Sequence, residues 1–115
     1  MGSWHPECPA RLAAIQDHLI ATGIAPFLAY YEAPLATVEA LSRAHTAAYL
    51  RKLQGSVPRQ GYQILDPDTS MNPHSWQAAL RAAGAVIDAT DRVLSGELAN
   101  AFCAVRPPGH HALAG

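Results

Sequence analysis

The sequence AFCAVRPPGHHA, residues 101–112, joins a short apolar run to two prolines, a glycine and two adjacent histidines. The apolar run, residues 101–105, is bounded by polar turns, and this pattern is typical of a strand buried on both faces of a sheet. Such a strand needs neighbouring strands, yet the sequence contains only one weak further candidate, the segment FLAYYEAP at residues 27–34. We therefore expect an α/β fold whose parallel sheet is incomplete within this chain.

The first half of the chain is predicted to contain three helices. Pro9 suits a first helical turn and Gly23 suits a C-terminal cap, with apolar residues at helical spacing between them. Thr37 is expected to cap a short helix, because its side chain can accept a hydrogen bond from the first helical turn. Thr46 is expected to cap the next helix in the same way.

The strongest helical pattern lies in the second half of the chain. Asn72 can cap a helix whose first residue is a proline, and apolar residues then recur on one face over residues 73–94. The preceding stretch, residues 54–73, is rich in glycine and proline and has no helical periodicity. It is expected to be the longest loop, and long loops in compact domains are often functional.

Composition excludes several classes of function. Half of the 115 residues are apolar, only 15% are charged, and the formal net charge is −1. This balance predicts neither nucleic-acid binding nor attachment to an anionic membrane. No apolar run approaches the ~20 residues of a membrane span, and no secretory signal is recognisable, so a cytoplasmic location is expected. The charged fraction lies below the roughly 25% of soluble domains, which indicates part of a larger core.

The cysteines do not form a recognisable pattern. Cys8 and Cys103 lie far apart and match no metal-binding spacing. We expect both thiols to be reduced and buried.

The histidine pair is the strongest candidate for chemistry. Ligands of open α/β sheets bind beyond the carboxyl ends of the strands, which is where His110 and His111 follow the expected strand. Two prolines restrict the loop, and Gly109 permits a left-handed backbone or a close approach of ligand. Such a loop suits acid–base catalysis, although an arbitrary histidine pair is more often incidental. The pair alone does not favour zinc, because catalytic zinc usually takes three protein ligands.

The chain resembles the histone deacetylase superfamily. The segment RPPGHHA is similar to the family's histidine motif, and three further segments are similar in the right order: HPECPARL at 5–12, RAHTAAYL at 43–50 and LDPDTSMNPHSWQAALRAAGA at 65–85. The HPE form favours the class II and bacterial branch, whose relatives include acetylpolyamine amidohydrolases and acetoin-utilisation proteins. The resemblance implies an arginase-deacetylase fold, with a central parallel sheet flanked by helices. Residues 1–115 would be the N-terminal portion of a single deacetylase domain, truncated just after the two histidines.

The resemblance also implies an activity and a cofactor. The family removes acetyl groups with zinc, and the substrate would be an acetylated protein or a small acetylated amine. By match, His111 would be the general base and then the general acid, and His110 its electrostatic partner. The family's zinc ligands lie downstream of the histidine pair, so we expect no metal ligand in this chain and no zinc bound by it.

Other residues take roles by the same resemblance. Arg11 matches an arginine that lines an inner cavity behind the catalytic site. Asp66 and Asp68 lie in the segment that resembles the substrate rim, where a carboxylate could accept a substrate N–H, and Gly109 is placed with them. The structural alternatives are an ion-paired helix residue for Arg11 and turn formation for the two aspartates.

Two alternatives to a protein deacetylase stay open. The chain could be an inactive fragment or a non-enzymatic interaction module, because the zinc ligands are expected elsewhere. It could also belong to an amidohydrolase that acts on acetylated polyamines or other small amides. His45 is interpreted as a cap or packing residue and Tyr49 as core packing, so neither is assigned a functional role.

Overall fold

The N-terminal part of the chain is built around one helix. The computed structural model describes residues 5–115, which divide into two compact units, one up to Glu32 and one from Ala33 to Gly115. In the first unit, helix α1 spans Ala10–Ala21 and the 3₁₀ helix η1 spans Ala25–Phe27. The predicted helix is confirmed: it begins after Pro9, and Gly23 follows its end with φ 74°. The weak strand candidate at residues 27–34 forms no strand.

The second unit begins with two helices that start as predicted. Helix α2 spans Val38–Leu41, and helix α3 spans Ala47–Gly55. Thr37 and Thr46 have extended backbones, and each side-chain hydroxyl accepts a hydrogen bond from the backbone N–H three residues later. These bonds satisfy donors that the first turn of a helix leaves without a partner, which explains why the helices begin there.

A hairpin interrupts the predicted loop. Strands β1, Gln63–Asp66, and β2, Thr69–Met71, pair antiparallel with Gln63 opposite Met71. The expectation of a continuous loop over residues 54–73 is wrong there. The reason is local: Asp66 Oδ1 accepts a hydrogen bond from the backbone N–H of Asp68 at 2.8 Å, and this turn brings the short strands together.

Helix α4, Ser75–Leu94, is the longest element. It begins two residues later than predicted, because Asn72 uses its side-chain oxygen to accept hydrogen bonds from the backbone N–H of His74 and the Ser75 hydroxyl. The backbone of residues 34–36 crosses α4 at Gly84, the buried residue of this helix. A hydrogen bond of 2.9 Å from Ala36 N to Leu80 O fixes the crossing.

Residues 101–105 do not form the predicted buried strand. Among residues 5–115 the structure has one sheet, the two-stranded hairpin, and 101–105 is not part of it. Phe102 is 77% exposed, and Cys103 is partly exposed with its Sγ 3.7 Å from the carbonyl oxygen of Ala85. The prediction of a buried strand, and of a buried Cys103, is therefore wrong for this structure, because a strand requires a partner for its backbone N–H and C=O groups.

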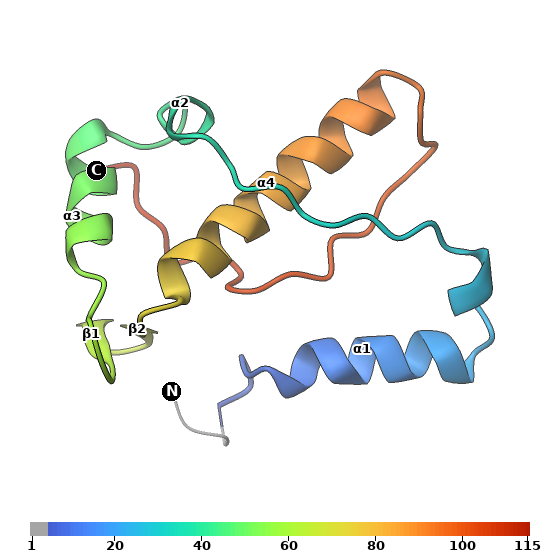
Figure 1. The fold of residues 1–115 in the computed structure, drawn as a ribbon, viewed down its shortest axis with the longest axis horizontal. Coiled ribbons are helices and arrows are strands. Elements are labelled where there is room, and N and C mark those ends of the chain that lie inside the picture. The colour runs from blue at the N-terminus through green and yellow to red at the C-terminus, as the bar shows by residue number, and fades with distance from the viewer. Residues whose placement is uncertain (1–4) are drawn as a thin grey trace. The chain divides into compact units, whose positions relative to one another are not determined.

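The mixed helices and strands are consistent with an incomplete α/β fold. Within residues 5–115, its buried apolar side chains are those of Ala36, Leu50 and Met71. After α4 the chain turns back, and its last residues lie beside the start of α3 (Figure 1). Within residues 5–115, no helix combines the length and apolar character that a bilayer crossing requires.

Candidate active site

The two histidines of the C-terminal loop occupy the centre of a turn. Gly109 has a φ of 82°, and its carbonyl oxygen accepts a hydrogen bond of 3.0 Å from the N–H of Ala112. His110 and His111 lie between these residues, and their ring centroids are 4.4 Å apart with the planes tilted by 49°. A Cβ atom at Gly109 would meet nothing within 4 Å. The glycine is therefore required by its left-handed backbone rather than by crowding.

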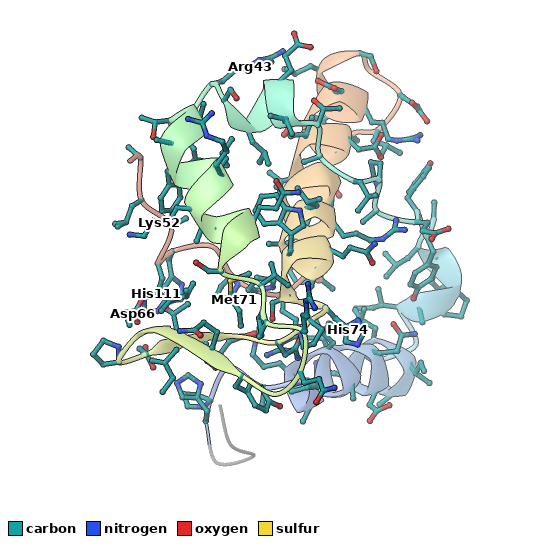
Figure 2. The ribbon with its side chains drawn as sticks, turned by 60° about the vertical axis from the view of Figure 1, so that its left-hand side comes forward. Arg43, Lys52, Asp66, Met71, His74 and His111 are labelled. Carbon is teal, nitrogen blue, oxygen red and sulfur yellow. The ribbon has the colours of Figure 1, made fainter. Side chains whose placement is uncertain are left out.

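The hairpin places two carboxylates at this turn. His111 Nε2 lies 3.4 Å from Asp68 Oδ2, and both side chains are substantially exposed. Figure 2 shows His111 over the hairpin beside Asp66. The structure thus brings His111 together with two other predicted site residues, His110 and Asp68, and Asp66 lies near enough to interact with the charge of His111.

The carboxyl group of Asp66 has an altered acidity. The Thr69 side chain, the backbone N–H of Asp68 and the charge of His111 together hold the pKa of Asp66 below its usual value. The Thr69 side chain has the largest of these effects on the pKa of Asp66. Asp66 therefore shapes the turn and carries a negative charge next to the histidine pair.

Residues at the start of α3 hold the other side of the loop. His45 Nδ1 donates to the carbonyl oxygen of Leu113 at 2.5 Å, and the N–H of Leu113 donates to the Tyr49 hydroxyl oxygen at 3.1 Å. The N–H of Thr46 donates to the carbonyl oxygen of Ala114 at 2.7 Å. The sequence interpretation missed these contacts, and no local pattern could have indicated them, because the bonds to Leu113 join residues 68 and 64 positions apart.

Arg11 lies in the N-terminal unit. Its Nη1 donates to Glu7 Oε2 at 2.5 Å, four residues earlier in the chain. The backbone N–H of Glu7 in turn donates to His5 Nδ1 at 3.0 Å. The ion-paired environment is the one expected of an arginine at the start of a helix, and the predicted role at an inner cavity stays a prediction.

The described part of the chain does not fit a zinc ion. Among residues 5–115, no group of three or more His, Cys, Asp or Glu side chains is arranged to hold a metal. Catalytic zinc usually takes three protein ligands. Cys8 and Cys103 are both free thiols, and neither is fully buried.

The similarity to known proteins covers almost the whole chain. The sequence profile of the family described as "Histone deacetylase domain" matches residues 5–115. The chain belongs to the histone deacetylase family. It is 37% identical over 95% of its length to a histone deacetylase-like amidohydrolase of Pseudomonas aeruginosa, and 39% identical over 94% to a probable deacetylase of Archaeoglobus fulgidus. These matches span 28% and 30% of the two relatives.

The fold agrees with this membership. A crystal structure of the HDA15 HD domain superposes with a TM-score of 0.88 at 33% identity, covering 99% of this chain and 33% of that one. The incomplete α/β fold is therefore the deacetylase fold over about a third of its length. Relatives named deacetylase or amidohydrolase come from a plant, Arabidopsis thaliana, as well as from this bacterium and this archaeon.

Proposed function

We propose that this chain contributes the proton-transfer half of a deacetylase active site, which removes acetyl groups from acetyl-lysine or related acetylated amines. The observation that supports the proposal most is the turn that places His110 and His111 side by side, with the Asp68 carboxylate 3.4 Å from His111 Nε2. Two adjacent imidazoles with a carboxylate partner suit general acid–base catalysis, since one ring can take a proton while its neighbour stabilises charge.

His111 is the proposed general base and then the general acid. It takes a proton from the attacking water and returns it to the leaving amine, so its ring must be held within hydrogen-bond reach of both. The Asp68 carboxylate offers a negative charge to the imidazolium that this transfer creates. His110, whose ring lies 4.4 Å away, is the proposed electrostatic partner of the oxyanion that forms on the acetyl carbonyl.

The substrate is proposed to approach along the hairpin. Asp68 is exposed, and its carboxylate can accept a hydrogen bond from a substrate N–H at the edge of the turn. Asp66 and Gly109 shape the same edge, and Arg11 is retained as the proposed residue of an inner cavity. Zinc is proposed to be held by ligands outside this chain, since residues 5–115 provide no suitable group.

The test compares histidine variants in the polypeptide that carries these residues together with the zinc ligands. His111→Ala is expected to lower kcat for an acetyl-lysine peptide by about 10²- to 10⁴-fold, the usual contribution of a general base. Asp91→Asn, at an exposed position of α4, is the control and should retain full activity. Unchanged kcat in His111→Ala would refute the assigned role.

A second measurement uses the 115 residues alone. We expect the purified chain to bind no stoichiometric zinc and to hydrolyse no acetyl-lysine peptide. Tight equimolar zinc accompanied by turnover would contradict the assignment of the ligands to another segment. Assays with an acetylated polyamine in place of the peptide separate the protein deacetylase from the small-amide amidohydrolase.

The alternative of an interaction module is favoured by exposed apolar side chains. Phe102 and Leu94 are 77% and 81% exposed, and large exposed apolar groups often mark a surface that another polypeptide covers. Sedimentation of the purified chain tests this alternative. A stable monomer at high concentration would argue against it.

A further inference from the structure

We propose that His45 and Tyr49 are positioning residues, which hold the loop of His110 and His111 in its working geometry through the backbone of Leu113. The inference rests on the proposed function, because it assigns the two residues an effect on catalysis through the histidine pair. The two side chains bind the backbone of Leu113 and contact each other, so their effect on the histidine rings is transmitted by the loop.

Both backbone groups of Leu113 are bound by side chains. Its carbonyl oxygen accepts from His45 Nδ1 at 2.5 Å, and its N–H donates to the Tyr49 hydroxyl at 3.1 Å. About two-thirds of protein hydrogen bonds join backbone to backbone, and these form with almost any side chain. The position of Leu113 depends instead on the side chains of two particular residues. The N–H of Thr46 adds a third bond, to the carbonyl oxygen of Ala114.

The two side chains also fix each other. The ring centroids of His45 and Tyr49 are 5.4 Å apart with the planes tilted by 36°. The residues lie four positions apart, and Thr46 between them caps α3 through its bond to the Tyr49 N–H. Tyr49 therefore lies in the first turn of α3 and His45 directly before its cap, a more precise support than a free loop.

The catalytic turn is consequently held on both sides. On one side, the His111 side chain lies beside Asp68 of the hairpin. On the other, Leu113 follows His111 by only two residues and is bound to α3. Release of Leu113 would leave the C-terminal side of the turn held only by the bond from Thr46 to Ala114, and we expect the imidazoles to leave the ~0.5 Å range that catalytic geometry tolerates.

A packing role and a positioning role predict different results for Tyr49→Phe. The substitution keeps the aromatic ring and its contact with His45 but removes the hydroxyl that accepts from the Leu113 N–H. If Tyr49 only packs, the loop is unaffected. If it positions the loop, the loss of one oxygen atom is sufficient to disturb His110 and His111.

The experiment follows the histidine ring signals by NMR in the full chain labelled with ¹³C-histidine, together with hydrogen exchange of the Leu113 amide. In Tyr49→Phe we expect the His110 and His111 signals to shift or broaden, and exchange of the Leu113 amide to accelerate at least tenfold. Tyr30→Phe is the matched control, because Tyr30 is an exposed tyrosine of the N-terminal unit. Its spectrum should match that of the unmodified chain.

His45 provides an independent variant. His45→Ala is expected to disturb the same signals, and His45→Asn is expected to restore part of the original spectrum, because an amide N–H can donate to the Leu113 carbonyl. Circular dichroism establishes that each variant is folded. Should Tyr49→Phe fail to fold, the comparison of His45→Ala with His45→Asn decides the question.

Activity separates this inference from the proposed function. In the zinc-containing polypeptide, Tyr49→Phe is expected to lower kcat by about 10- to 100-fold with little change in KM, as expected when reacting groups are displaced by about 1 Å. Unchanged ring signals, or loss of activity in His111→Ala with full activity in Tyr49→Phe, would overturn the positioning role alone. Full activity in His111→Ala would instead remove the proposed catalytic role, whatever the spectra of the Tyr49 and His45 variants show.

Discussion

Gly84, in the middle of α4, lies against the backbone of the segment that crosses the helix, and its replacement by alanine is expected to destabilise the chain. A Cβ atom at this position would lie 2.0 Å from the carbonyl oxygen of Pro34, 2.8 Å from its carbonyl carbon and 2.9 Å from the N atom of Ala36. All three are backbone atoms, so no flexible side chain can move aside. The oxygen must retreat by at least 1 Å, from 2.0 Å to the 3.0 Å below which Cβ contacts do not occur.

The expected loss of stability combines three effects. Overpacking of a buried site costs about 1–3 kcal/mol. The same displacement breaks the 2.9 Å hydrogen bond from Ala36 N to Leu80 O, which costs about 1 kcal/mol more. Alanine offsets about 1 kcal/mol through its higher helix propensity. The free energy of unfolding of Gly84→Ala should therefore be lower by about 1–3 kcal/mol.

Urea unfolding followed by far-ultraviolet circular dichroism measures this difference. Gly55→Ala is the matched control, since Gly55 ends α3, has no atom within 4 Å of a Cβ atom and has no left-handed backbone. It should raise the free energy of unfolding by up to about 1 kcal/mol. The reasoning fails if Gly84→Ala stabilises the chain, or if the two variants change stability equally.

Three further predictions concern the helix cap and the hairpin. Thr46→Ala removes the hydroxyl that accepts from the Tyr49 N–H and should lower the free energy of unfolding by about 1 kcal/mol, whereas Thr46→Ser should retain most of it in the same urea assay. The pKa of Asp66 is lowered in the folded chain, so the ionised carboxylate stabilises the fold above the unfolded-state pKa of about 3.9, and this contribution is lost as the pH falls through the lower folded value. Asp66→Asn should therefore flatten the rise of stability with pH below about pH 4, and an unchanged acid limb would contradict the assignment. An NMR titration of Thr69→Val should show the carboxyl pKa of Asp66 moving up, toward its usual value.

Local patterns in the sequence predicted the helices well. The two threonine caps and the end of α4 at Leu94 follow from residue preferences and spacings that act within one or two helical turns. The start of α4 was placed two residues early, because the Asn72 side chain bonds a turn that precedes the helix rather than its first turn. The hairpin was missed because its strands are too short for alternation to stand out from the surrounding turn residues.

The apolar run at residues 101–105 shows where local patterns fail to predict the structure. Its composition predicts a buried strand, but strand formation depends on partners that residues 5–115 do not offer. The candidate site was likewise predicted only in part. Motif and loop chemistry singled out His110, His111 and the two aspartates, whereas the contact of His111 with Asp68 joins residues 43 positions apart and was visible only in three dimensions.

The sequence by itself determined the family, the helix caps and the stiff, glycine-containing loop that carries two histidines, because these depend on residue identity and short spacing. Only the tertiary structure decided what holds that loop. The bonds from His45 and Tyr49 to Leu113 join residues 68 and 64 positions apart, and no local preference reports such a partner. The return of the chain to α3 is what brings the His45 and Tyr49 side chains within hydrogen-bond reach of Leu113.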